Sequence, residues 1–463
     1  MDYQTVPALL PALFTPSAQV LIIDIDGDTI NEVVVLNPEI GQLAVIHQFT
    51  FNELSPADWP VTTPGATAPQ WWNLWTTPPS GAVPGGWTVQ TGDVMIAGDF
   101  DGNGIAELFL YNTFTLQWGL VQWQRATNSL TTIAYQPNGC PNWQPQTGDE
   151  FFLFPNPAGS AAAGLLAHNP VTPALGVLQF VSGTLSFPPP VLGGNVDGWI
   201  FRSGDQFHAG NFSGATTGEF LLFNPNTWIA RLTWDGSAFG ISAGQSGTLG
   251  KAPLGHGKWD IRGNDVLQCV DLDGDGLDEV LVYNPSGYLG AWKWIVADSQ
   301  FQCLAATKLI DNWTIGNLDQ YTPVRVGSSN SICGYNSTTA QTSLLHYASG
   351  GFVCDVAQRD LEHPDGWPVS NSDQYYGAPV ASPASASLFV VSPQVPLARE
   401  NAVSTLGALS AVGSMISVGS RVTLPAPGWT PTLLAGTHDA VCEFPNPATG
   451  RRLCLCEQPV LFV

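Results

Sequence analysis

The residues best suited to chemistry lie in an acidic stretch that runs from Asp271 to Glu279. Its acids at positions one, three, five and nine, with a Gly at position six, can surround one hard cation with oxygen ligands, and the carbonyl of Leu277 adds another. An EF-hand would need a Glu at position twelve, where this chain has Val282, and it would need helical flanks. The flanks here are rich in strand formers and end at an Asn-Pro pair. The stretch therefore predicts a calcium-binding turn between two strands.

Two further stretches repeat this pattern, and in all three copies the first acid lies 13 positions before an Asn. The three copies predict up to three structural Ca²⁺ ions. The alternative is a polar turn that binds no metal. A catalytic metal would need a His or an open coordination position, and no His lies within these stretches. The expected ligands, of which Ile30, Ile105 and Leu277 act through their carbonyls, are Asp24, Asp26, Asp28, Ile30 and Glu32; Asp99, Asp101, Asn103, Ile105 and Glu107; and Asp271, Asp273, Asp275, Leu277 and Glu279.

A second marker, a Trp followed six residues later by an Asp, gives the length of the repeat. Successive Trp residues of these pairs are 54 to 60 positions apart, and four short apolar or alternating segments lie between them. Four antiparallel strands in each repeat are typical of a β-propeller blade. The pairs are Trp87 with Asp93, Trp143 with Asp149, Trp199 with Asp205, Trp259 with Asp265, Trp313 with Asp319, and Trp367 with Asp373.

The whole chain, residues 1–463, is therefore predicted to form one all-β domain, a β-propeller. Residues 52–84 are expected to be a loop insertion, and residues 1–19 are expected to close the ring with the C-terminal blade, which would remove exposed sheet edges. Eight blades are preferred and seven are the alternative. The eight inner hairpins are placed near Val20, Val94, Phe151, Phe207, Val266, Thr322, Ala378 and Leu433.

Composition supports this fold and limits the partners. With 49 Gly and 37 Pro the apolar residues, 44% of the chain, are divided into short segments that disfavour long helices. A net charge of −23 repels phosphate, so nucleic acid and anionic membranes are poor partners. No apolar run is long enough to span a membrane, and Pro7 and Pro11 interrupt the N-terminal apolar segment, so no secretory signal is expected. We expect a soluble protein that is cytoplasmic or leaves by a non-classical route; the eight Cys leave the disulfide state open.

The acidic stretches resemble the FG-GAP or VCBS repeats that form the propellers of integrin α-subunit heads and of fungal lectins for N-acetylglucosamine. The resemblance rests on Asp271 to Val282, Asp99 to Leu110 and Asp24 to Val35, and the Trp–Asp register extends it over most of the chain. It implies a propeller, commonly of seven blades, and bound calcium. It leaves function open, because such propellers serve adhesion, sugar binding, toxin subunits and a few enzymes. Thr29 and Asn103 depart from the family pattern, so calcium affinity is expected to differ between turns.

The six Trp–Asp pairs are also candidate glycan-binding sites. The apolar face of a sugar stacks on an indole, and a nearby carboxylate accepts hydrogen bonds from its hydroxyl groups. The alternative is that each Trp packs between neighbouring blades while the Asp ties down a loop. Under the first hypothesis, repeated weak sites would give avidity for glycoconjugates.

We therefore expect a calcium-stabilised, lectin-like propeller, with two alternatives from other classes. One is an enzyme, a lyase, hydrolase or cyclase, that uses His208 or Arg325 in the axial channel. The sequence contains no serine-hydrolase, zinc-protease or phosphate-loop motif, which makes an enzyme less favoured. The other is a protein-docking or toxin-scaffold propeller. Sugar specificity and oligomeric state stay open.

Overall fold

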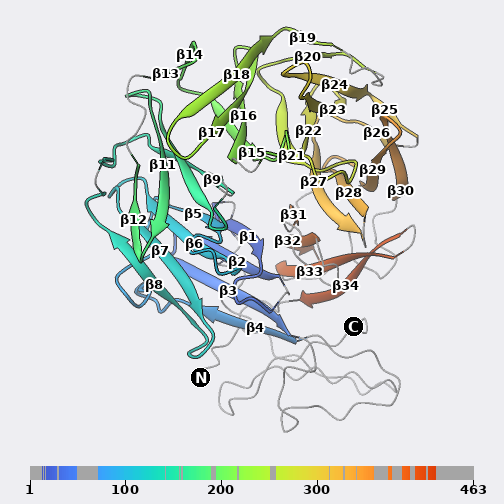
Figure 1. Ribbon diagram of the computed structural model, residues 1–463. Coiled ribbons are helices and arrows are strands. Elements are labelled where there is room, and N and C mark those ends of the chain that lie inside the picture. The colour runs from blue at the N-terminus through green and yellow to red at the C-terminus, as the bar shows by residue number, and fades with distance from the viewer. Residues whose placement is uncertain are drawn as a thin grey trace, which may run out of the picture.

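The chain is organised as a ring of small antiparallel sheets around a central opening (Figure 1). The computed structural model describes residues 17–358 apart from short gaps, residues 13 and 15, and four strands between residues 374 and 423. The gaps are residues 29–30, 50–70, 141, 156, 158–159, 189–193, 216–217, 251–256, 312, 327–328 and 340.

Seven four-stranded sheets, each built from consecutive strands, are described. We number them as blades one to seven in chain order. They are β1 (Gln19–Ile23), β2 (Glu32–Asn37), β3 (Gln42–Phe49) and β4 (Trp71–Thr76); β5 (Asp93–Gly98), β6 (Glu107–Asn112), β7 (Trp118–Gln124) and β8 (Ser129–Gln136); β9 (Glu150–Phe154), β10 (Gly164–Asn169), β11 (Ala174–Val181) and β12 (Thr184–Ser186); β15 (Gln206–Gly210), β16 (Gly218–Asn224), β17 (Trp228–Trp234) and β18 (Phe239–Ser246); β21 (Val266–Val270), β22 (Glu279–Asn284), β23 (Tyr288–Ile295) and β24 (Gln300–Thr307); β27 (Asp319–Val326), β28 (Ser329–Asn336), β29 (Gln341–Ala348) and β30 (Gly351–Gln358); and β31 (Gln374–Gly377), β32 (Leu388–Pro396), β33 (Ala402–Val412) and β34 (Met415–Thr423).

Three two-stranded ribbons lie between the blades, close to the Trp–Asp loops. They are β13 (Asn195–Val196) with β14 (Trp199–Ile200), β19 (Thr248–Leu249) with β20 (Trp259–Asp260), and β25 (Leu309–Ile310) with β26 (Trp313–Thr314). Three of the expected Trp residues therefore begin the second strand of a ribbon.

The first strands of the blades lie side by side and close the ring. β1 contacts β5, β5 contacts β9, β9 contacts β15, and β15 contacts β21; on the other side β27 contacts β31, and β31 contacts β1. The side chain of Gln268 on β21 donates a hydrogen bond to the carbonyl of Tyr321 on β27 at 2.9 Å. The predicted all-β propeller of four-stranded blades is confirmed.

The preferred count of eight blades is wrong. Six blades have described side chains, and the backbone of a seventh sheet, β31 to β34, lies between blade six and blade one. The ring closes at this seventh sheet, because β31 contacts both β27 of blade six and β1 of blade one. The eighth hairpin, placed near Leu433, lies outside the described residues, as do residues 1–12 and the C-terminal segment expected to close the ring.

Burial explains the strand sequences. The second strand of a blade has neighbours on both edges and packs on both faces, so every residue of β2, β6 and β22 is buried, and between the first Glu and the last Asn each strand has four consecutive apolar or aromatic residues. The first strands begin with alternating buried and exposed residues and continue with partly buried ones, so they are less completely buried than the second strands. The expectation that residues 52–84 form a loop is wrong in part, because Trp71–Thr76 forms strand β4 and pairs with β3.

Candidate metal centres

The acidic stretches form the turns between the first and second strands of blades one, two and five. In each turn the first carboxylate accepts backbone N–H groups of its own turn. Asp99, for example, accepts from Gly102 at 2.8 Å and from Gly104 at 2.8 Å. Gly104 has φ +86°, a conformation that favours glycine. The local sequence therefore folds the chain so that its carboxylates converge.

Ten of the expected metal-binding carboxylates lie close enough to share an ion, in groups whose ligand atoms are within 4.8 Å of one another. The groups are Asp24, Asp26 and Asp28; Asp99, Asp101 and Glu107; and Asp271, Asp273 and Glu279, while Glu32 joins Asp26 in a fourth group with His47. The fifth positions, Asn103 and Asp275, accept the N–H of Ile105 and Leu277 at 2.7 and 2.9 Å. Ile30 lies outside the described residues.

The Glu at position nine is buried in the same way in four blades. One of its oxygens, Oε2, accepts the backbone N–H of position two: Ile25 to Glu32 at 3.0 Å, Phe100 to Glu107 at 2.8 Å, Phe212 to Glu219 at 2.8 Å and Leu272 to Glu279 at 2.9 Å. Burial raises the pKa of Glu32 to about 10, and that of Glu107 and Glu279 to about 7. Each buried carboxylate therefore favours a compensating positive charge.

The third strand supplies a different group to the other oxygen, Oε1, in each of these blades. In blade one it is an imidazole, in blade two an amide, in blade four a guanidinium and in blade five an ammonium. The atom pairs are His47 Nδ1–Glu32 Oε1 at 3.7 Å, Gln122 Nε2–Glu107 Oε1 at 3.0 Å, Arg231 Nη2–Glu219 Oε1 at 2.6 Å and Lys293 Nζ–Glu279 Oε1 at 2.6 Å.

Blade five thus carries its own cation in the turn, Asp271 to Glu279, from which the calcium pattern was first read. Lys293 Nζ also lies 2.9 Å from Asp273 Oδ2 and 2.8 Å from Asp275 Oδ2. Burial alone would lower the pKa of Lys293, but its bonds to these carboxylates raise it above its ordinary value. Sequence reasoning missed this residue because only the register of β22 with β23, Val280 opposite Trp292, places it opposite Glu279.

Blade four has lost the acids at positions one, three and five but keeps the hairpin. Glu219 stays buried and receives hydrogen bonds from Arg231 and from the hydroxyl of Ser213. The Arg231 guanidinium lies over the Trp294 ring at 4.9 Å. A side-chain cation therefore stands beside the position-nine carboxylate in this turn.

The turns also join neighbouring blades. The carbonyl of position one accepts the N–H of position eight from the next blade: Ala106 donates to Asp24 at 3.5 Å, Ala163 to Asp99 at 2.6 Å and Asp278 to Asn211 at 2.7 Å. Anything that fixes the shape of one turn consequently fixes an interblade contact.

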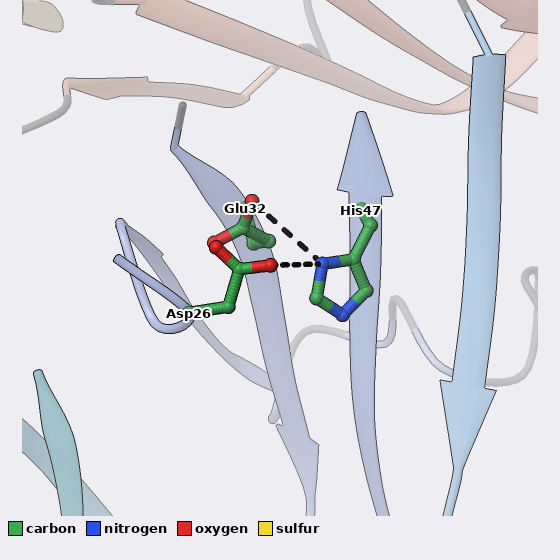
Figure 2. A group of neighbouring side chains, drawn as sticks. All are labelled: Asp26, Glu32 and His47. Carbon is green, nitrogen blue, oxygen red and sulfur yellow. Dashed lines mark ion pairs between the residues drawn. The ribbon is translucent and has the colours of Figure 1, made fainter. Parts of the chain in front are cut away.

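The turn of blade one brings in a histidine that the sequence did not assign to it. Figure 2 shows His47 on β3 facing Asp26 and Glu32. Its Nδ1 lies 3.8 Å from Asp26 Oδ2. Burial lowers the pKa of His47 to about 4, so the imidazole is neutral at pH 7. No His lies within the acidic stretch itself; this imidazole comes from another strand, β3.

The Trp–Asp pairs form a repeated hydrogen-bonded unit inside the blades. The same Asp Oδ2 that accepts the indole also accepts a backbone N–H three residues earlier, and Oδ1 accepts the amide of the Asn that ends the second strand. In blade six Trp313 reaches Asp319 through the Tyr321 hydroxyl. Trp367 and Asp373 lie outside the described residues. The indole Nε1 donates to Asp Oδ2 from Trp87 to Asp93 at 3.2 Å, from Trp143 to Asp149 at 3.0 Å, from Trp199 to Asp205 at 3.2 Å and from Trp259 to Asp265 at 2.9 Å.

The carboxylates of these pairs are buried, which favours the alternative that they tie down loops over the hypothesis that they bind sugar hydroxyl groups. Asp205 is 3% exposed, although it was expected to bind a ligand together with Trp199. Its Oδ2 accepts the Arg202 N–H at 3.0 Å in addition to the Trp199 indole, and its Oδ1 accepts the Asn224 amide. Asp93, Asp149, Asp265 and Asp319 are buried as well. These carboxylates therefore tie loops to strands.

The indole faces of these pairs pack against the chain. A Cβ added to Gly119, on the third strand of blade two, would lie 2.6 Å from the Trp87 ring, and Gly290 stands in the same relation to Trp259. Trp87 and Trp259 are 1% and 4% exposed. For Trp87 and Trp259 this geometry supports the packing alternative over a sugar platform, because both the ring faces and the carboxylates are already engaged; Trp199 is half-buried.

The two channel candidates are less informative. His208 on β15 is partly buried, and its Nε2 lies 3.4 Å from Gln206 Oε1. Burial lowers the pKa of His208 to about 4. Its partner Gln206 is not a titratable residue, so this contact does not form an acid–base pair. Arg325 lies on β27, and its side chain is outside the described residues.

Comparisons with known proteins find only distant structural matches. No family model and no curated protein matches the sequence, so the FG-GAP and VCBS resemblance stays a resemblance. A Bacteroides uniformis structure named "putative 6-phosphogluconolactonase" matches with a TM-score of 0.43 and 11% identity over 88% of this chain and 96% of that one. A Lactobacillus plantarum protein matches with a TM-score of 0.39 and 11% identity over 83% and 97%. Matches this distant carry no argument about function.

In the described part of the chain no helix has the length and apolar character to cross a membrane.

Proposed function

We propose that this chain is a cation-stabilised β-propeller that binds glycans at repeated surface sites, with Ca²⁺ as its structural ion. The observation that carries the calcium part is the turn of blade two. Carboxylate oxygens of Asp99, Asp101 and Glu107 lie within 4.8 Å of one another, and the third-strand partner, Gln122, is neutral. Among the described residues no ion pair reaches these three acids. Converging carboxylates without a side-chain cation are the setting that a hard divalent ion stabilises.

An ion in this turn would act on the ring as well as on the hairpin. The carbonyl of Asp99 accepts the Ala163 N–H of blade three at 2.6 Å. Fixing the Asp99 backbone therefore supports the contact between two blades. We expect the ion to be structural because its ligands are turn residues that the second strand anchors through buried Glu107.

Calcium binding is tested by titrating chelator-treated full-length protein with Ca²⁺ in a calorimeter and by thermal melting. Wild type is expected to bind Ca²⁺ and to melt higher in its presence. Asp99→Asn combined with Asp101→Asn removes the blade-two site and reduces both effects. Asp235→Asn, in the exposed turn between β17 and β18, is the matched control and should behave as wild type. A melting temperature that Ca²⁺ does not change in wild type would contradict the proposal.

Exposed apolar side chains support a binding surface at the opposite end of the ring. The turns between second and third strands lie at that end because the strands are antiparallel. Phe114 and Val171, in these turns of blades two and three, are 73% and 76% exposed, and Trp228, the first residue of β17 after the turn of blade four, is 47% exposed. Exposed aromatic rings such as those of Phe114 and Trp228 are suited to the apolar face of a sugar. The glycan proposal therefore rests on these turns and no longer on the buried Trp–Asp pairs.

A glycan array tests this assignment. Trp228→Ala and Phe114→Ala are expected to lower the signal of wild type severalfold without unfolding the protein. Val296→Ala, an exposed residue in the turn between β23 and β24 at the acidic end, is the matched control. No binding to any glycan would contradict the lectin-like function, and a ligand found beside His208 in the channel would then favour the enzyme.

A further inference from the structure

The turn of blade one differs from the other two acidic turns in its donor atoms. It contains two donor groups that share Asp26: one with Asp24 and Asp28, and one with Glu32 and His47. The groups in blades two and five consist of carboxylates alone. Among the described residues, the turn of blade one is thus the acidic turn in which a ring nitrogen, from His47, lies beside the oxygen donors.

The spacing within the second group fits a shared ion better than direct hydrogen bonds. His47 Nδ1 lies 3.8 Å from Asp26 Oδ2 and 3.7 Å from Glu32 Oε1 (Figure 2). Both separations exceed hydrogen-bond distance. Bonds of about 2.0–2.2 Å to one central ion, at angles between tetrahedral and trigonal, separate their donors by about 3.3–3.8 Å.

A buried oxygen aimed into this group provides an independent observation. Glu32 is 1% exposed, and its Oε1 has no hydrogen-bond partner among the described residues, whereas Oε2 accepts the Ile25 N–H. Leaving a buried carboxylate oxygen unpaired is costly, and a metal ion bound beside Oε1 would remove that cost.

The other two donors are oriented by contacts outside the group. The His47 ring lies against Trp123 of blade two, with ring centroids 4.4 Å apart, and His47 is 2% exposed. Asp26 Oδ1 accepts the Asp28 N–H at 3.0 Å and lies 3.4 Å from Arg125 Nη2, which directs Oδ2 toward His47. Such outer contacts are what fix metal ligands in place.

We propose that Asp26, Glu32 and His47 form a mixed nitrogen–oxygen site for a borderline divalent metal of the Zn²⁺ class. Imidazole is a ligand for Zn²⁺ and its neighbours, whereas carboxylate and carbonyl sets suit Ca²⁺. Three protein ligands leave a fourth position for water. This inference goes beyond the calcium proposal, because it assigns a different metal selectivity to one blade, and it can fail while calcium binding in blade two holds.

The test uses chelator-treated full-length protein titrated with Co²⁺, whose visible absorption reports nitrogen and oxygen coordination, followed by displacement with Zn²⁺. Wild type is expected to bind one Co²⁺ with a visible band that Zn²⁺ removes. His47→Gln gives blade one the residue that blade two has in Gln122, and it should weaken Co²⁺ binding at least tenfold while Ca²⁺ affinity changes less than twofold. Gln122→His makes the reverse change and should add a second Co²⁺ site.

His346→Gln is the matched control, because His346 also pairs with an acid, Asp355, at 2.7 Å, but on an exposed part of blade six. It should bind Co²⁺ as wild type does. The proposal is overturned if wild type binds no Co²⁺, if His47→Gln binds it as well as wild type, if the band depends on His346, or if Gln122→His adds no site. Should His47→Gln not fold, zinc-edge X-ray absorption of wild type with one equivalent of Zn²⁺ decides: imidazole scattering supports the site, and an oxygen-only shell overturns it.

Discussion

Asn211 and Asp278 bond to each other in both directions across the interface between blades four and five. The Asn211 N–H donates to Asp278 Oδ2 at 2.7 Å, and the Asp278 N–H donates to the Asn211 carbonyl at 2.7 Å. The Asn211 amide adds a bond to the Gly276 carbonyl at 2.8 Å. A turn that has lost its acids at positions one, three and five is therefore held by the acidic turn of the next blade, so these turns stabilise the ring as well as their own hairpins.

Asp278→Ala tests how much that contact stabilises the ring. It removes the acceptor of the Asn211 N–H and makes blade five resemble blade two, which has Ala106 at this position. We expect the free energy of unfolding to fall by about 1–2 kcal/mol, the usual cost of an unpaired donor. Urea unfolding measures it. Asp278→Asn keeps an oxygen acceptor and should lose less; equal stability of Asp278→Ala and wild type would exclude a stabilising role.

Lys293→Gln tests whether the ammonium takes the place of a metal in blade five. Without metal the variant should be less stable by about 3–5 kcal/mol, because buried Glu279 loses its partner. Its Ca²⁺ affinity should rise at least tenfold, because four acids then converge without a side-chain cation. Calorimetric titration and chemical unfolding check both. Unchanged calcium stoichiometry and affinity would show that Lys293 and Ca²⁺ do not compete.

Arg231→Met tests the corresponding pair in blade four. Glu219 is 2% exposed, so removing its guanidinium partner should cost about 3–5 kcal/mol. Adding Glu219→Gln removes the unpaired charge and should recover part of the loss. A double-mutant cycle of unfolding free energies gives the coupling. Additive losses would mean that the two side chains act independently.

Trp87→Ala and Trp228→Ala separate structural from surface tryptophans. Trp87 is 1% exposed, and its removal should cost about 3–5 kcal/mol. Trp228 is 47% exposed, and its removal should cost less than about 1 kcal/mol. Unfolding curves measured for both proteins distinguish the two roles. Comparable losses would show that Trp228 is also part of the packing.

The Trp–Asp units predict a pH dependence of stability. Burial raises the pKa of Asp93 to about 6, and it also raises the pKa of Asp149 and Asp265. The folded state therefore holds protons that the unfolded state releases near pH 4, so this contribution to stability is present below about pH 4 and is lost as pH rises toward 6. Unfolding in chelator across this range measures the slope. Asp93→Asn should flatten it, and a slope of opposite sign would contradict the assignment.

The sequence alone determined the repeat unit and the acidic turns. Both depend on short, regular spacing: the carboxylates of a turn lie within nine residues, and four of the Trp residues bond an Asp six residues later. Such contacts form wherever the local backbone closes. The second strands could also be predicted from their apolar sequences, because a central strand is buried on both faces. This is why the propeller class could be predicted.

Only the tertiary structure decided the blade count and the chemistry of each turn. The ring closes where β31 contacts β1, and these strands lie more than 350 residues apart in the sequence. The spacing of the repeats does not predict which strand makes this contact. The partners His47, Arg231 and Lys293 lie 12 to 15 positions after the Glu they face, and strand pairing places them there. Burial of Trp87 against Gly119 likewise follows from packing. The physical reason is that spacing along a chain fixes local geometry, whereas neighbours across a sheet or a blade interface exist only once the sheets have formed.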